Sequence, residues 1–321
     1  MTADIAPERG LMGEGLMEEG LIAEAGQTKR FLNRRRKEAG LGYLMLAPSL
    51  LIFSVFVFYP FFKNFYLGFF RTPPFPGLPA RFVGLDQFRE VLTSDYFTNS
   101  FRVTIVFALL TVPAGIILGL LLAMVANQRL KGIGAYRTIF SSTVATSVAV
   151  ASVIFGTLLN PQVGLLPWLG LTTNPSILEN PKYALFAVAV TTIWQNLGLS
   201  FIVMSSGLQA IPDEIIEATE VDGAHPWTRF WRVTLPLLSP TVFFAFVVGS
   251  IVAFQTFGQI DLLTQGGPID KTNVLTYAIY KALRDQNEGK AAVLAVALFG
   301  VTLLLTTAQM RILERRVHYG N

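Results

Sequence analysis

Six long runs of apolar residues limit what this chain can fold into. They occupy about residues 41–60, 103–126, 139–159, 183–208, 241–263 and 291–310, and the first continues as an aromatic segment to Phe70. A helix needs about 20 consecutive apolar residues to cross a bilayer, because each residue advances it by only about 1.5 Å. The runs therefore predict an all-α polytopic membrane protein with six transmembrane helices.

The composition agrees with this class and excludes several others. Of the 321 residues, 52% are hydrophobic and 14% are charged, and the mean hydropathy is +0.51. The net charge of +4 does not indicate nucleic-acid binding, because the basic residues gather at the ends of the runs. The chain has no Cys, and its two His residues, His225 and His318, are far apart and outside the runs. We therefore expect no disulfide framework, no thiol catalysis and no metal site.

The residues before the first run differ in character from the rest of the chain. Residues 1–28 are acidic, and residues 29–37 (KRFLNRRRK) are strongly basic. A secretory signal has the opposite order, basic and then apolar. Basic residues beside a span stay on the cytoplasmic side. We interpret residues 1–38 as a flexible cytoplasmic tail, acidic and then polybasic, and residues 39–321 as a six-helix domain with both termini in the cytoplasm.

The segments between the runs predict smaller features. The Pro-rich residues 71–79 indicate an external loop, followed by a short surface helix that begins at Gly84. Residues 160–181 and 264–290 are expected to be external as well. Within the second run, small residues recur at four-residue spacing, which favours close packing against another helix. These residues are Gly115, Gly119 and Ala123.

The most polar stretch between two runs is residues 212–236, PDEIIEATEVDGAHPWTRFWRVTLP, within a cytoplasmic loop of residues 209–236. Pro212 suits the first turn of a helix, and the acidic residues after it oppose the positive end of the helix dipole. Gly223 permits the chain reversal at which such a helix stops. A second segment, residues 227–235, carries aromatic and basic side chains before Pro236 closes it. The pattern predicts two short helices at a membrane surface, exposed to a partner.

The spacing in this loop resembles the coupling loop of permease subunits in binding-protein-dependent ABC importers. The matching residues are Glu217, Ala218, Thr219, Asp222, Gly223, Ala224, Val233, Leu235 and Pro236. Thr219 stands where that family has Ala, and both are small. Residues 262–268 (LLTQGGP) and 314–319 (ERRVHY) are similar to the maltose and glycerol-3-phosphate branch of sugar permeases.

The resemblance implies a type I ABC importer permease fold and a non-catalytic subunit in a bacterial or archaeal inner membrane. It implies a heterodimer with a second permease and two ATPase subunits, which would carry ATP and Mg²⁺. An extracytoplasmic solute-binding protein would deliver a sugar or polyol, possible solutes including glycerol-3-phosphate. Glu217 and its neighbours would dock into a cleft of the ATPase. The chain itself has no Walker-type phosphate loop (GxxxxGK[ST]), so its energy must come from a partner or an ion gradient.

Polar and aromatic residues in the fourth and fifth runs are candidates for the substrate pathway. Their amides and hydroxyls suit sugar hydroxyls, and the aromatic rings could stack on sugar faces. The candidates are Gln195, Asn196, Ser200, Phe254, Gln255, Thr256, Phe257 and Gln259. In the resembled family these two helices contribute to the substrate cavity. The alternative is that the polar groups only hydrogen-bond between helices, and the sequence leaves both open. No Lys or Arg lies deep in these runs, which favours a neutral solute over a phosphorylated one.

Two alternative functions are an ion-coupled secondary transporter and a non-transporting membrane scaffold. An ion-coupled secondary transporter of a polar solute would want intramembrane carboxylates or helices broken in an internal repeat. The first four runs and the sixth contain no Asp or Glu. A non-transporting membrane scaffold would have no need of the coupling-loop spacing. The importer permease is therefore the preferred interpretation.

Overall fold

The computed structural model describes residues 41–73, 79–128, 131–170 and 176–313, so the predicted tail, residues 1–38, lies outside the described part. The chain divides into two compact units, Met1–Lys63 and Asn64–Asn321. Residues 41–53 are α-helical and continue through a π-helical turn, Ser54–Phe58, into α2 (Tyr59–Leu67). The whole helix, Leu41–Leu67, is long and apolar enough to cross a membrane. The first predicted span is confirmed and extends further than residue 60.

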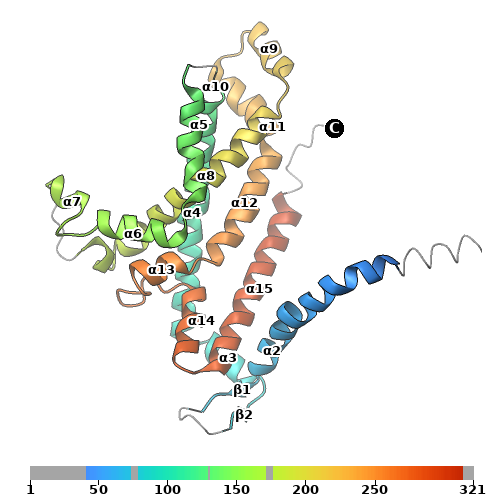
Figure 1. Cartoon of the computed structure of the whole chain (residues 1–321), viewed down its shortest axis with the longest axis vertical. Coiled ribbons are helices and arrows are strands. Elements are labelled where there is room, and N and C mark those ends of the chain that lie inside the picture. Colours follow the sequence, from blue (N-terminus) through green and yellow to red (C-terminus); the bar gives the residue numbers. More distant parts are fainter. Residues whose placement is uncertain (1–40, 74–78, 129–130, 171–175, 314–321) are drawn as a thin grey trace, which may run out of the picture. The chain divides into compact units, whose positions relative to one another are not determined.

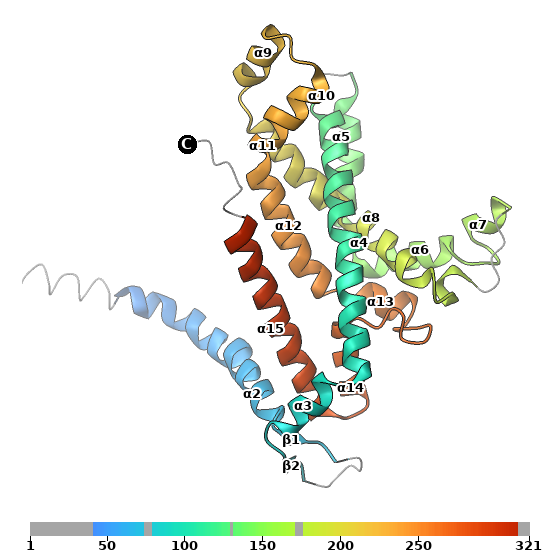
Figure 2. The same ribbon diagram turned by 180° about the vertical axis from the view of Figure 1, so that it is seen from behind.

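Three long helices correspond to the second, fourth and sixth predicted runs. They are α4 (Asp95–Ala126), α8 (Ala184–Gln209) and α15 (Glu288–Leu313), and each passes the same test for a span. α4 begins before the apolar run because the Ser94 hydroxyl caps it, accepting a hydrogen bond of 3.2 Å from the Phe97 N–H. α4 packs against α8 and also against α12 (Ser239–Phe254), which in turn packs against α15 (Figures 1 and 2).

The predicted single helix over residues 139–159 is wrong. The segment consists of α5 (Ile133–Ser141), a 3₁₀ turn (Ser142–Ala145) and α6 (Val148–Leu158), and its two halves meet at 104°. The break lies against the backbone of α8, where a Cβ on Gly198 would come within 2.9 Å of the Val144 nitrogen. After the break, the Ser147 hydroxyl accepts a hydrogen bond of 3.2 Å from the Val150 N–H and starts α6 anew. The bend is therefore fixed by a tertiary contact and a local cap.

The fifth predicted span is also not one helix to residue 263. α12 ends at Phe254, residues 255–257 are not helical, and α13 (Gly258–Leu263) follows. The Thr276 hydroxyl donates a hydrogen bond of 2.9 Å to the Phe254 carbonyl and so satisfies one of the carbonyls left free where the helix stops. At its other end, α12 is preceded by the segment Pro226–Leu237, bent from it by 65°. The four unbroken helices and the two bent pairs give up to six spans in the described chain.

Short elements fill the segments outside the spans. β1 (Phe70–Arg71) pairs antiparallel with β2 (Arg81–Phe82), a small departure from the predicted all-α class. The short helix predicted at Gly84 is confirmed as α3 (Asp86–Leu92). Residues 160–181 contain α7 (Leu165–Trp168) and a 3₁₀ turn (Ile177–Glu179).

Residues 264–290, predicted only as an external segment, contain the helix α14 (Leu275–Arg284). Its buried side chains Leu275, Ala278 and Ala282 recur at helical spacing, and Lys281 and Arg284 lie in its last turn. This amphipathic pattern could have revealed it.

The close packing predicted for the small residues of the second run is confirmed. A Cβ on Gly119 would lie 2.7 Å from the Ser200 Cβ and 2.9 Å from the Ser200 carbonyl carbon, so only glycine allows α4 and α8 to approach this closely. One turn further on, Ala123 is fully buried in the cluster that contains Phe201 and Met204.

Candidate functional site

The first helix of the predicted coupling loop is present as α9 (Asp213–Val221). Pro212 occupies the cap, one position before the predicted first turn, and Asp213 and Glu214 lie in that turn. At the other end Gly223 has φ = +70°, and the Ala224 N–H donates a hydrogen bond of 3.0 Å to the Thr219 carbonyl. The reversal predicted at Gly223 is therefore confirmed.

α9 is acidic, and most of it is open to solvent. Its carboxylates are Asp213, Glu214, Glu217 and Glu220, with Asp222 directly after it, and all five residues are exposed. Ala218 and Gly223 are exposed as well, Thr219 and Ala224 are partly buried, and Val221 is 88% exposed. An apolar side chain so exposed beside carboxylates leaves a face that a partner could cover.

The second half of the loop forms one curved helical segment in three parts. These are α10 (Pro226–Arg229), the π-helical turn η4 (Phe230–Thr234) and α11 (Leu235–Leu237). The prediction that Pro236 closes the segment is wrong, because the helical segment continues past it to Leu237. An ion pair between Glu220 and Arg229 joins this segment to α9.

A cavity of about 360 Å³ separates the loop from the ends of the spans. Part of its wall comes from the ends of α4 and α8, and the rest from the two halves of the loop. The lining residues include Met124, Asn127, Leu208, Ile216, Pro226, Arg229, Phe230 and Thr234. Figures 1 and 2 show α9 and α10 at the same end of the second unit as α5.

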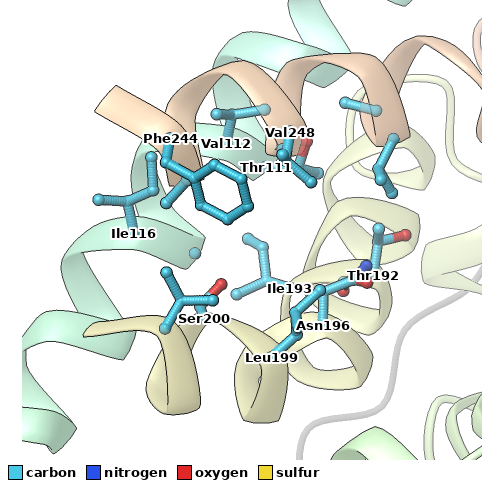
Figure 3. A pocket seen from close by; sticks show the side chains of 16 residues that line it. Thr111, Val112, Ile116, Thr192, Ile193, Asn196, Leu199, Ser200, Phe244 and Val248 are labelled. Carbon is cyan, nitrogen blue, oxygen red and sulfur yellow. The ribbon is translucent and has the colours of Figure 1, made fainter. Parts of the chain in front are cut away.

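Two of the eight substrate-pathway candidates, Asn196 and Ser200, line a cavity of about 160 Å³ between α4, α8 and α12. Figure 3 shows Phe244 and Val248 of α12 on the opposite side from the α8 side chains. The Asn196 amide donates a hydrogen bond of 3.0 Å to the Thr192 carbonyl on its own helix. Pockets for drug-sized ligands hold about 300–1,000 Å³, so this one is only a small part of any complete site.

Three further candidates form hydrogen bonds near the two helix breaks. The Gln195 amide donates a hydrogen bond of 3.3 Å to the Thr146 carbonyl, in the break before α6. The Gln259 amide donates to the Gln195 side-chain oxygen at 3.5 Å, and Thr256 donates to the Val252 carbonyl at 3.2 Å. In this conformation the two Gln side chains link α8 to the break before α6 and to α13, whereas the Thr256 bond stays within its own span.

The last three candidates differ in their access to solvent. Phe254 is 2% exposed and belongs to a core cluster with Ala108 and Val112, so a sugar ring cannot reach it in this conformation. Phe257 is partly buried and stacks on Tyr277, with ring centroids 6.0 Å apart. Gln255 is exposed at the end of α12 and makes no side-chain hydrogen bond within the described residues.

The aromatic neighbours of Phe257 were not among the candidates. Tyr280 meets the Phe257 ring edge-on at 5.0 Å, and Tyr277 lies 5.7 Å from Tyr280. Burial, and after it the nearby Asp261 carboxylate, raise the pKa of Tyr277. A tyrosine hydroxyl is protonated at neutral pH even without this shift, so that of Tyr277 can donate a hydrogen bond.

Comparisons with known proteins identify what the chain resembles as a whole. A family described as "binding-protein-dependent transport system inner membrane component" matches residues 115–319. The sn-glycerol-3-phosphate transport system permease protein UgpA of Agrobacterium fabrum is 37% identical over 286 residues, 87% of this chain and 97% of that protein. The protein of the same name from Rhizobium meliloti has the same identity and coverage, and that from Brucella abortus is 36% identical.

Solved structures share the fold. A chain of a bacterial ABC transporter that imports the acidic polysaccharide alginate has a TM-score of 0.75 and 24% identity, covering 88% of this chain and 98% of its own. A chain of the alginate transporter in complex with an alginate pentasaccharide-bound periplasmic protein has a TM-score of 0.75 and 23% identity. The match covers 87% of this chain and 96% of that one. At this level of identity the similarity shows the fold alone.

Proposed function

Because this chain belongs to the family of binding-protein-dependent transport system inner membrane components, we propose that the solute it moves is a carbohydrate or polyol. The chain is the membrane-spanning, non-catalytic permease subunit of an ATP-driven importer with the type I importer permease fold. It works with a second permease, with ATPase subunits and with an extracytoplasmic binding protein. The proposed class of solute includes sn-glycerol-3-phosphate, which appears in the name of a relative that is 37% identical to this chain.

The observation that carries the coupling proposal is the exposed helix α9 within the part of the chain that the family matches, residues 115–319. In this proposal Glu217, Ala218, Thr219, Asp222, Gly223 and Ala224 dock into a cleft of the ATPase, and Leu235 and Pro236 pass the movement to α12. ATP and Mg²⁺ are bound by the ATPase, and this chain needs no cofactor of its own. Closure of the two ATPases pushes α9, and the spans rock from inward-facing to outward-facing.

The substrate side of the proposal rests on residues of the cavity between α4, α8 and α12 and on residues at the two helix breaks. Asn196, Ser200 and Gln255 offer polar groups to a cavity or to solvent. Gln195, Thr256 and Gln259 are bonded within the protein in this conformation. Movement of the broken spans would free these amides and this hydroxyl for a solute, and would expose Phe254 and Phe257 to a sugar face.

The chain is a multi-pass inner membrane protein, and we place both termini and α9 in the cytoplasm. Two observations support this orientation. Lys131 lies just before α5 and Arg137 within it, and Figure 1 shows α5 at the same end of the second unit as α9. Basic residues concentrate on the cytoplasmic side of inner membrane proteins.

The proposal is tested by extracting the tagged chain from its own cells in mild detergent and analysing what co-purifies by mass spectrometry. We expect an ATPase, a second six-span permease and a secreted carbohydrate-binding protein. The ligand that remains bound to that binding protein then identifies the solute. Recovery of the chain alone in every preparation would contradict the importer assignment.

A further inference from the structure

The second half of the coupling loop, Pro226–Leu237, turns away from the direction of α12. It is bent by 65° from α12, which follows it directly. Transmembrane helices tilt by about 20° on average, so this segment makes an angle of about 45–85° with the membrane normal. Over this range the segment lies nearer to the plane of the membrane than to its normal.

The length of α12 fixes the depth of this segment. α12 has 16 residues and is about 24 Å long, whereas the hydrocarbon core of a bilayer is about 30 Å thick. A helix of this length fits within the core, so each of its ends lies within about 6 Å of a membrane boundary. The segment is thus placed where side chains meet lipid headgroups.

The two faces of the segment have different surroundings. Pro226, Arg229, Phe230 and Thr234 line the cavity beneath the loop. On the opposite face Trp227 is 67% exposed and Trp231 is 50% exposed, although their rings are in contact at 5.7 Å. Thr228 and Arg232 are also exposed, and Arg232 has no ion-pair partner among the described residues. Two tryptophans and an unpaired guanidinium therefore form one outward face.

The two halves of the loop carry opposite charge, and this favours an anionic partner for the outward face. Pro226–Leu237 contains no acid and two Arg, of which Arg229 pairs with Glu220 and Arg232 is exposed, whereas α9 contains four carboxylates and no basic residue. An anionic membrane surface attracts the first and repels the second. Tryptophan is enriched at the level of lipid headgroups, where its ring is apolar and its N–H can donate a hydrogen bond.

We propose that Trp227, Thr228, Trp231 and Arg232 form a face that binds anionic phospholipid headgroups of the cytoplasmic leaflet. The tryptophan rings insert between headgroups, and the Arg232 guanidinium pairs with a phosphate. This contact keeps the second half of the coupling loop at the level of the lipid headgroups when a push on α9 moves the loop. The inference depends on the proposed function only for the side of the membrane.

The test uses the whole importer in lipid nanodiscs, with one fluorophore on a Thr228→Cys variant. The chain has no native Cys, so no background substitution in it is needed, and both tryptophans are kept. Quenching is measured with lipids spin-labelled near the top of the acyl chain that carry either phosphatidylglycerol or phosphatidylcholine headgroups. The matched control is the same fluorophore on Val221→Cys, at the exposed end of α9.

We expect the fluorophore at position 228 to be quenched, with phosphatidylglycerol enriched around it by about fivefold for one nearby arginine. Arg232→Gln should abolish that preference, and the fluorophore at position 221 should be quenched by neither lipid. Three results would overturn the inference: no quenching at position 228, equal quenching by the two lipids, or quenching that appears only after the ATPases are removed. The last result would assign the face to the ATPase.

ATP-dependent uptake is measured in vesicles prepared with the same variants, which separates this inference from the proposed function. Lipid quenching without any ATP-dependent uptake by the unmodified importer would contradict the function and leave the lipid face standing. Uptake without quenching would contradict the lipid face and leave the proposed function standing.

Discussion

At the scale of single residues, Gly223 is required by the backbone and not by lack of space. Its φ is +70°, and nothing lies within 4 Å of a Cβ built there. Proline fixes φ near −65°, so Gly223→Pro should displace α9 and lower coupled uptake about tenfold, within the range of ordinary coupling energies. ATP hydrolysis should continue. Uptake and hydrolysis are measured in the same vesicles.

Two further variants complete this test. Gly223→Asn is the control, because asparagine tolerates the left-handed conformation, and it should retain most of the uptake. Glu217→Lys reverses an exposed charge that makes no ion pair within the described residues, so it should uncouple uptake without loss of assembly. Normal uptake by both Gly223→Pro and Glu217→Lys would refute the coupling assignment.

Gln255 is the candidate residue that best separates substrate contact from helix packing. It is exposed and makes no side-chain hydrogen bond within the described residues, whereas Gln195 is bonded to the break in the third span. Gln255→Ala should raise the KM for uptake by about fivefold, the equivalent of one hydrogen bond to the solute. It should leave thermal stability unchanged. Unaltered kinetics would favour packing as the role of these polar residues.

At the scale of helices, the contact between α4 and α8 depends on Gly119. A larger side chain there meets the backbone of Ser200 and should destabilise the protein by about 1–3 kcal/mol, the usual cost of overpacking. The measurement is the thermal unfolding midpoint of Gly119→Leu in detergent. Gly300→Leu in α15 is the matched control, since nothing lies within 4 Å of a Cβ there. Equal midpoints for the two variants would contradict the close contact.

The ion pair between Glu220 and Arg229 is expected to join the two halves of the coupling loop into one lever. The Glu220 side chain is 60% exposed, so the pair adds less than about 1 kcal/mol to stability. Glu220→Arg or Arg229→Glu alone should lower the amount of solute moved per ATP, and the double exchange should restore it. Single variants that keep the full ratio of solute to ATP would show that α9 acts without this link.

Hydropathy predicts the spans but not their breaks. The second, fourth and sixth spans are confirmed because an uninterrupted apolar helix is both long enough and locally stable. The third and fifth are broken because of contacts with residues distant in sequence, Gly198 for the first break and Thr276 for the second. A count of apolar residues holds no information on such neighbours.

The candidate site shows the same limit. The coupling loop could be predicted because its motif and its turn at Gly223 are local, and the structure confirms the helix and the reversal. The polar residues of the spans could not be divided into solute contacts and packing contacts from sequence. An amide such as Gln195 has the same chemistry in either role, and only its partner Thr146, brought near by the bend in the third span, shows how it is used here.

At the scale of the whole molecule, the second to sixth spans and the coupling loop belong to one compact unit, Asn64–Asn321. α9 connects to α8 on one side and, through η4 and α11, to α12 on the other. Both of these helices line the cavity that contains Asn196 and Ser200. A push on α9 can therefore reach the residues proposed for the substrate pathway through two continuous helices.

The most direct test of this account is solute uptake into vesicles that contain the purified importer: this chain, its second permease, the ATPases and the binding protein. The account predicts uptake that needs both ATP and the binding protein, and that is lost when Glu217→Lys replaces the native chain while ATP is still hydrolysed. Uptake driven by an imposed ion gradient, without ATP or ATPases, would contradict it and identify the chain as a secondary transporter.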